Sequence, residues 1–412
     1  FYAEHDIDLR LGAEVAAIDT GRRVVTLVTG GEVPYDELVL TTGSSPRRLP
    51  AAIGGDLQGV LTMRDIRDAD ALAPSLAEGK RVIGVGPYHV PEELVHAAGA
   101  VPFGVWGAIG SSDNAKKYFP PFYCSICQMT LEMGMTGKLN GLSGMMITGL
   151  CDTLRAFSQN WKAAMGTKIP MIYVTNSQNR FIEAGRTYAI ESYTEVKRGV
   201  EECANAIIEN DDMLASIKLY NEWRAAMREF VELAGAHPAE VSVADRVAVI
   251  NAGYYELKEE HLAQVKALNA ELAKLPESTA GFNKIVLSGI YEDIPAITEI
   301  LDANKYAVVA DDLAKESRAF SREVPEAGCA IEALADGWCN LKEDPELFDP
   351  KKAHLDALVK KAKDSGAQGV VILLAKFCDP EEFEAPLATK ALREAGIPVV
   401  TIEVDQSTES YE

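Results

Sequence analysis

Short apolar runs alternate with helical patterns along most of this chain of 412 residues, and this alternation constrains its fold more than any other feature. Residues 370–375, which run into the stretch "VILLAKFCDPEEF" (residues 371–383), form a continuous apolar run, which is typical of a strand covered on both faces of a parallel sheet. Similar runs occur at residues 82–85, 145–150, 171–175, 284–290, 306–312 and 397–405. The alternation predicts an α/β fold with doubly wound parallel sheets.

The spacing of these runs predicts the domain organisation. Helical patterns without strand-like runs fill residues 181–234 and 241–275. We therefore expect two Rossmann-like α/β domains, at residues 80–180 and 279–412, joined by a helical region at 181–278. Residues 1–79 are richer in strand-forming patterns and predict a separate β-rich segment.

Charge and composition exclude several classes of protein. The hydrophobic fraction of 47% is that of a globular protein, whereas the net charge of −22 argues against nucleic acid and against an anionic membrane surface as partners. No apolar run is long enough to span a membrane. Seven cysteines, most of them far apart in the sequence, do not resemble a secreted disulfide framework, so we expect a cytoplasmic protein.

Three of the cysteines occupy similar sequence settings. Cys378 follows an apolar run and precedes a helix start, for which Asp379 is the expected N-cap and Pro380 the first helical residue. Cys151 also follows an apolar run, and Cys124 follows a Pro-Pro loop where a helix is expected to begin. Ligands bind at the carboxyl ends of strands in open α/β sheets, and a helix N-terminus favours a thiolate.

These settings leave three interpretations of the cysteines open. The three thiols could meet in a cleft between the two α/β domains and hold an iron–sulfur cluster with one iron not bound by protein. They could instead hold zinc together with one water molecule. They could also be unrelated core cysteines, because free cysteines are often buried and inert.

The first 85 residues resemble pyridine-nucleotide-dependent flavoprotein reductases. The likeness lies in "YDELVLTTGSSPRRLP", "GVLTMRDIRDADAL" and "GKRVIGVG", in which Thr42 and Gly43 match a segment that lies against FAD in that family. The glycine-rich turns of the family are missing, because Pro87 and Tyr88 stand where close backbone approach to a phosphate is needed. We therefore expect a reductase fragment, from a fusion or an assembly join, that binds no FAD.

Residues 80–406 resemble the 2-hydroxyacyl-CoA dehydratase and benzoyl-CoA reductase family. The motifs are "PEELVHAAGAVPFGVWG", "YFPPFYCSICQ", "GLCDTL", "QNWK", "ADDLAKESRAF" and "KFCDPEEFEAPL". They are most similar to the β-type dehydratase subunits, among which those acting on (R)-2-hydroxyisocaproyl-CoA are the nearest named type. The cluster cysteines of the family fall on Cys124, Cys151 and Cys378, which implies a [4Fe-4S] cluster.

The resemblance also implies an activity and partners. A β-type subunit relays an electron for the elimination of water from an (R)-2-hydroxyacyl-CoA through a ketyl radical, giving a 2-enoyl-CoA. It works as a heterodimer with an α-type subunit, which binds most of the acyl-CoA, and receives its electron from an ATP-dependent iron–sulfur activator. Such enzymes serve anaerobic amino-acid fermentation. A benzoyl-CoA reductase subunit and a flavoprotein fragment are the alternatives.

Other polar residues carry weaker expectations. Cys127 forms a C-x-x-C pair with Cys124, and we expect it to be a neighbour of the cluster and not a ligand. His89 and Glu92 either line the cleft or form a solvated helix cap. Asn160, Trp161 and Lys162, in the motif "QNWK", either face the partner or the cofactor, or are a plain core tryptophan and a surface lysine. Packing is expected of the remaining cysteines, which are Cys203, Cys329 and Cys339. Both chain ends are expected to be truncated.

Overall fold

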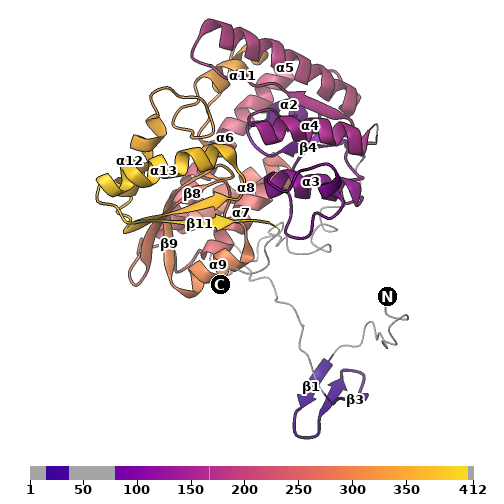
Figure 1. Ribbon diagram of the computed structural model, residues 1–412, viewed down its shortest axis with the longest axis vertical. Coiled ribbons are helices and arrows are strands. Elements are labelled where there is room, and N and C mark those ends of the chain that lie inside the picture. Colours follow the sequence, from indigo (N-terminus) through magenta and orange to yellow (C-terminus); the bar gives the residue numbers. More distant parts are fainter. Residues whose placement is uncertain (1–14, 37–78, 167, 407–412) are drawn as a thin grey trace. The chain divides into compact units, whose positions relative to one another are not determined.

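The computed structural model describes residues 15–36, 79–166 and 168–406, and the chain divides into two compact units, residues 1–46 and 47–412. In the first unit, a three-stranded antiparallel sheet is formed by β1 (Val15–Asp19), β2 (Val24–Leu27) and β3 (Glu32–Pro34) (Figure 1). This sheet fits the expected β-rich segment. The segment around Thr42 and Gly43 lies outside the described residues.

The second unit contains two parallel sheets of four strands each. The first sheet has the order β5-β4-β6-β7, with β4 (Val82–Gly86), β5 (Val101–Gly104), β6 (Gly144–Thr148) and β7 (Met171–Val174). The second has the order β11-β10-β8-β9, with β8 (Asn283–Gly289), β9 (Tyr306–Leu313), β10 (Gly369–Ala375) and β11 (Val399–Val404). The predicted α/β class is confirmed.

The two sheets share one topology. Numbered along the chain within each sheet, the strands of both have the spatial order 2-1-3-4, in which the connections change direction between strands 1 and 3. That reversal is the topological switch point, where open α/β sheets bind ligands beyond the carboxyl ends of their strands. The switch points lie between β4 and β6 in the first sheet and between β10 and β8 in the second.

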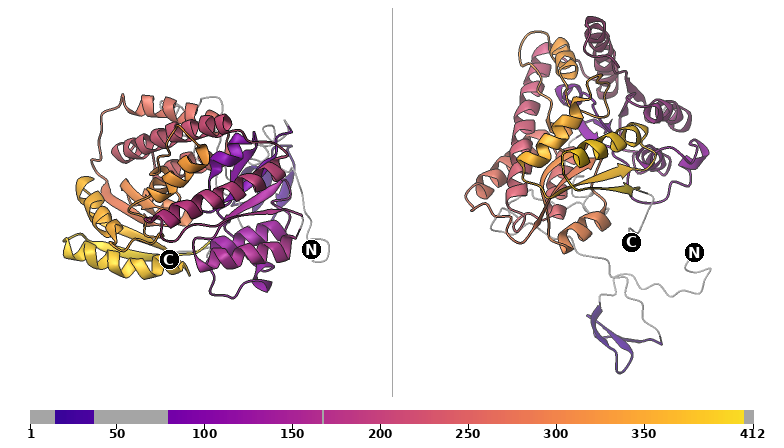
Figure 2. Two further views of the ribbon diagram at one scale, coloured as in Figure 1. Left: turned by 90° about the horizontal axis from the view of Figure 1, so that it is seen from above. Right: turned by 60° about the vertical axis from the view of Figure 1, so that its left-hand side comes forward.

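Helices cover both faces of each sheet because the strands are apolar on both sides. The first sheet is flanked by α2 (Glu92–Ala97), α3 (Ser125–Met135), α4 (Asp152–Met165) and α11 (Ala330–Cys339), and a 3-10 turn at Ala115–Lys117 precedes α3. The second is flanked by α9 (Pro295–Ala303), α10 (Ser317–Phe320), α12 (Ala353–Asp364) and α13 (Asp379–Glu394). Figures 1 and 2 show α12 and α13 side by side along one face of the second sheet.

Four long helices connect the two sheets. They are α5 (Glu183–Ala204), α6 (Asn210–Ala236), α7 (Val243–Tyr255) and α8 (Lys258–Leu272). The helical pattern at residues 181–234 is thus two helices, because the backbone turns left-handed at Asn205, with φ of 52°. Asparagine is one of the few side chains that tolerate this conformation. The predicted domain boundaries themselves remain a prediction.

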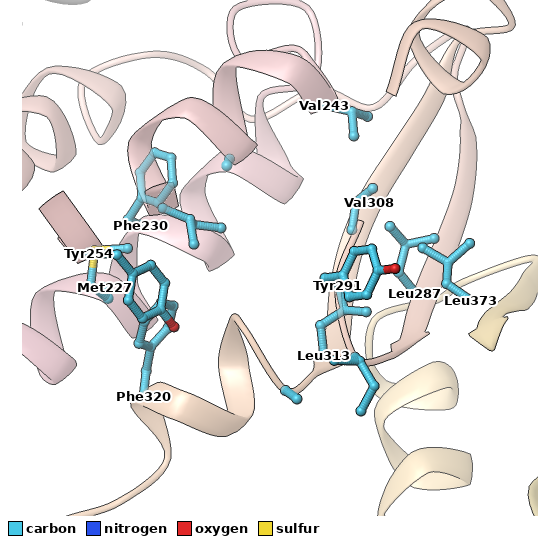
Figure 3. Packing of buried hydrophobic residues seen from close by; sticks show 14 of the residues in the cluster. Met227, Phe230, Val243, Tyr254, Leu287, Tyr291, Val308, Leu313, Phe320 and Leu373 are labelled. Carbon is cyan, nitrogen blue, oxygen red and sulfur yellow. The ribbon is translucent and has the colours of Figure 1, made fainter. Parts of the chain in front are cut away.

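The largest core cluster lies between these helices and the second sheet. Phe230 of α6 and Tyr254 of α7 face Phe320 of α10, and Leu287 of β8 lies beside Leu373 of β10 (Figure 3). All five side chains are buried. This packing fixes the helical region against the inner face of the second sheet, which holds the carboxyl ends of its strands in place. None of the described helices is long and apolar enough to cross a membrane.

Candidate iron–sulfur site

Each of the three candidate cysteines is the N-cap residue of a helix. Cys124 caps α3, Cys151 caps α4 and Cys378 caps α13, and all three have extended backbone conformations. The expected N-cap of α13, Asp379, is therefore wrong by one residue, and Asp379 is instead the first residue of the helix. An N-cap position brings a side chain close to the unpaired N–H groups of the first helical turn.

Cys151 and Cys378 occupy equivalent positions in the two sheets. Each follows the third strand of its sheet, β6 or β10, at the topological switch point. The Leu154 amide donates a hydrogen bond to the Cys151 sulfur, with a nitrogen–sulfur distance of 3.4 Å. Cys124 comes from the loop that leads into α3 and lies beside both core clusters that meet at the site. Strand ends and helix starts thus deliver thiols from both α/β domains.

One cavity brings the three thiols together. Residues that follow the first strand of each sheet, Tyr88 and Ile290, also line it, so the cavity lies where the two switch points face each other. Its lining combines thiols, apolar side chains and one carboxyl group. The lining residues are Pro87, Tyr88, Trp106, Cys124, Ile126, Cys127, Leu150, Cys151, Leu154, Ile290, Ala314, Glu346, Ala375 and Cys378.

The cavity disfavours uncompensated negative charge on most of its thiols. Burial raises the pKa of Cys151 to about 12, and the nearby Cys124 adds to this effect. Burial raises the pKa of Cys378 well above its usual value, and the negative charge of the Glu346 carboxyl group is the next largest cause. The pKa of Cys124 is lowered, because Cys127 hydrogen-bonds to it at a sulfur–sulfur distance of 3.8 Å. A cationic centre would supply the missing compensation, since metal coordination deprotonates a thiol outright.

The side chains of the cavity do not form a preassembled site for a single ion. Among residues 15–36, 79–166 and 168–406, no three His, Cys, Asp or Glu side chains are grouped closely enough to hold one metal ion. Zinc requires its ligands within about 2.3 Å of one point, so a zinc site here would need the thiols to move closer together. The irons of a [4Fe-4S] cluster are spread over several ångströms, and both this cluster and zinc remain predictions for the thiols of the cavity.

His89 and Glu92 lie beside this cavity and do not line it. Both line a neighbouring cavity together with Trp106 and Tyr220. The His89 side chain is only 5% exposed, so the interpretation of His89 as part of a solvated helix cap is wrong. Its Nε2 lies 2.7 Å from a carboxylate oxygen of Asp344. Burial lowers the pKa of His89, although the hydrogen bond to Asp344 opposes this effect.

The remaining candidates lie elsewhere. Trp161 is fully buried and donates a hydrogen bond to the Ile169 carbonyl, whereas Lys162 is exposed. Of the other cysteines, Cys203 packs beneath β6 and Cys339 lies at the end of α11, while Cys329 is exposed. None of these side chains lines the thiol cavity. Sequence reasoning missed Glu346, because it lies in the loop before α12, where no periodic pattern or motif marks it.

The fold and the site define an α/β protein with two doubly wound domains that share one thiol-lined cavity. Residues 87–412 match the family described as 2-hydroxyglutaryl-CoA dehydratase, D-component. The chain belongs to this family, a family of dehydratases, which confirms the predicted relationship.

Curated relatives agree with this assignment. The (R)-2-hydroxyglutaryl-CoA dehydratase β subunit of Acidaminococcus fermentans is 44% identical over 345 residues, which cover 82% of this chain and 91% of that protein. The (R)-phenyllactyl-CoA dehydratase β subunit of Clostridium sporogenes is 38% identical, over 81% and 89% of the two chains. A benzoyl-CoA reductase subunit of Thauera aromatica is 25% identical, over 80% and 86%.

The amino-terminal part has separate relatives. Residues 2–87 match the pyridine nucleotide-disulphide oxidoreductase family. Rubredoxin-NAD(+) reductase of Pseudomonas putida is 37% identical over 98 residues, which cover 24% of this chain and 25% of that protein. The similarity confirms the flavoprotein-like character expected of this segment and covers only a quarter of the reductase.

Proposed function

We propose that the chain is the β-type subunit of a 2-hydroxyacyl-CoA dehydratase and holds a [4Fe-4S] cluster through Cys124, Cys151 and Cys378. The observation that carries the proposal is the shared cavity, to which two equivalent strand ends and one loop each contribute a helix-capping thiol. The β subunits of dehydratases are 38–44% identical to this chain, whereas a benzoyl-CoA reductase subunit is 25% identical. Dehydration is therefore favoured over ring reduction.

The protein's own residues prepare the cavity for electron transfer. When bound, an iron–sulfur cluster supplies reversible one-electron transfer, which the ketyl-type elimination of water from an acyl-CoA needs. The three cysteines would fix its position from helix starts, and at Cys151 the Leu154 N–H also stabilises negative charge on the sulfur. Trp106 and the apolar side chains around the thiols limit access of water to the cavity.

The proposed function requires partners. An α-type subunit would bind most of the acyl-CoA, and an ATP-dependent activator would deliver the first electron, in the cytoplasm of an anaerobic cell. The acyl groups in the names of the relatives differ, among them 2-hydroxyglutaryl, phenyllactyl and lactoyl, so we assign this chain a 2-hydroxyacyl-CoA without choosing one.

The experiment is anaerobic co-expression of the chain with an α-type subunit, followed by iron and sulfide analysis and dehydration assays with several 2-hydroxyacyl-CoA esters. We expect about four irons on this chain and a broad visible absorbance, both lost in Cys151→Ser. Cys203→Ser is the matched control, because Cys203 lies outside the cavity and its loss should leave the iron content unchanged. A colourless wild-type protein without iron would overturn the proposal.

A further inference from the structure

Glu346 is the one carboxyl group among the described residues that line the thiol cavity. Its side chain is 8% exposed, and it reaches the cavity from the loop between α11 and α12. The remaining lining is made of thiols, aromatic rings, proline and aliphatic side chains. A carboxyl group is costly to bury in such surroundings unless something in the cavity compensates for it.

The protein itself supplies Glu346 with little compensation. Its Oε1 atom has no hydrogen-bond partner, and Nη1 of Arg318 lies 4.0 Å away, beyond hydrogen-bond range. That guanidinium is already engaged by Glu381 at 3.1 Å and by Asp312 at 3.1 Å. The carboxyl group of Glu381, which lies next to that of Glu346, is also buried. The only cation near Oε1 among the described residues is thus the Arg318 guanidinium, at ion-pair distance and shared with two other carboxylates.

The loop that carries Glu346 is held in place from the opposite domain. The Asp344 carboxylate accepts hydrogen bonds from the Glu346 backbone N–H, at 2.9 Å, and from the Tyr88 hydroxyl, at 2.5 Å. His89 contacts the same carboxylate. Tyr88 and His89 follow β4, so these contacts fix the position of Glu346 relative to the switch point of the first sheet. Such support is typical of a group that must be held in one geometry.

We propose that the Glu346 carboxylate is the fourth protein ligand of the cluster, bound to the iron that the three cysteines leave free. The inference rests on the proposed function and deepens it. On binding, the carboxyl group loses its proton to solvent, one iron–oxygen bond forms, and any water on that iron is released. Carboxylate oxygen is an accepted ligand for iron, and a bond to iron would give the buried oxygen the direct partner that the Arg318 guanidinium, 4.0 Å away, does not supply.

Isotopically labelled water tests the assignment without an activity assay. The wild-type chain, assembled with its cluster and reduced, is transferred to water enriched in oxygen-17, and its electron paramagnetic resonance spectrum is recorded. With Glu346 on the iron, no solvent oxygen is bound, so we expect no oxygen-17 broadening. In Glu346→Gln and Glu346→Ala, water takes the free position and the lines broaden. Glu343→Ala, an exposed change in the same loop, should behave as wild type.

The outcomes separate this inference from the proposed function. A wild-type chain that binds a cluster but shows oxygen-17 broadening of its lines overturns the fourth-ligand assignment and leaves the three cysteines as ligands. A wild-type chain that binds no iron overturns both. The wild-type spectrum decides the matter even if a variant fails to fold. Unbroadened wild-type lines with broadened lines in either variant support the assignment.

Discussion

The sulfur atoms of Cys124 and Cys127 lie 3.8 Å apart, at the N-cap and the third residue of α3. A disulfide bond brings sulfur atoms to about 2.05 Å, so a small rotation of the two side chains would allow them to join. Pairing would remove Cys124 from the set of proposed cluster ligands. The spacing therefore makes the cluster-free chain sensitive to oxidation at this turn.

We expect diamide to oxidise the cluster-free chain at Cys124 and Cys127, with both thiol protons lost and two electrons passed to the reagent. Peptide mass mapping should find this disulfide, and the oxidised chain should take up little iron until a dithiol reduces it. Cys127→Ser should keep its iron uptake after the same treatment, and Cys203→Ser should respond as wild type. A disulfide from Cys124 to Cys151 or Cys378 instead would contradict the prediction.

Glu93 of α2 joins both α/β domains through a buried charge cluster. Its carboxylate accepts hydrogen bonds from Arg322, at 2.8 and 3.0 Å, and pairs with Arg224 of α6. Glu93→Gln leaves both guanidinium groups without an anionic partner in the interior, so we expect a loss of about 3–5 kcal/mol in the free energy of unfolding, measured with urea at pH 7. Glu332→Gln removes an exposed partner of Arg186 and should cost less than about 1 kcal/mol.

The contribution of Glu93 to the stability of the fold depends on pH. Burial alone would raise the pKa of Glu93, but Arg322 and Arg224 lower it to about 2. A carboxylate with a lowered pKa stabilises the fold above its ordinary value of 4.5, and that contribution is lost as the pH falls from 4.5 towards 2. Wild type should therefore lose stability over this range more steeply than Glu93→Gln. Parallel curves for the two proteins would show that Glu93 is not ionised in the fold.

The turn after β4 should bind no dinucleotide. A dinucleotide site there would need backbone N–H groups pointing at a pyrophosphate, but Pro87 and Pro91 have none, and α2 has only six residues. The Tyr88 ring, 7% exposed, fills the space beyond the strand and hydrogen-bonds to Asp344. We expect the purified chain to show no flavin absorbance and no fluorescence change on addition of FAD. Stoichiometric FAD in the preparation would disprove this.

The sequence allowed the strands and the thiols to be predicted because both depend on local patterns. Continuous apolar runs locate β4, β6 and β10 to within about two residues, since a strand buried on both faces needs them. Cys151 and Cys378 follow such runs, so their place at strand ends could be inferred without contacts. The edge strand β5 carries Pro102 and gave no comparable pattern, as expected of an edge position.

The features that could not be predicted depend on contacts between distant residues. Glu346 enters the cavity only because Asp344 pairs with Tyr88, which lies 256 residues away in the sequence. The burial of His89 has the same cause. The break between α5 and α6 at Asn205 depends on one residue in a left-handed conformation within a long helical pattern. Local propensity is a weak guide to such positions, because tertiary packing decides them.

His261 of α8 should make the helical region sensitive to acid. Its Nδ1 accepts a hydrogen bond from the Trp223 indole N–H at 2.8 Å, and its Nε2–H faces the Val249 carbonyl at 2.9 Å. Only the neutral ring satisfies both contacts. Burial, reinforced by the charge of Lys258, lowers the pKa of His261 to about 3 from 6.5.

A histidine with a lowered pKa binds fewer protons in the folded chain than in the unfolded chain, so stability falls as the pH drops from 6.5 towards 3. At pH 4.5 the loss from this group should reach about 2–3 kcal/mol. We expect His261→Leu to be less stable than wild type at pH 7, because Trp223 loses its acceptor, but to lose less stability between pH 7 and 4.5. Urea unfolding of both proteins at the two pH values measures the difference. An equal loss in both would mean that the acid sensitivity of the fold arises elsewhere.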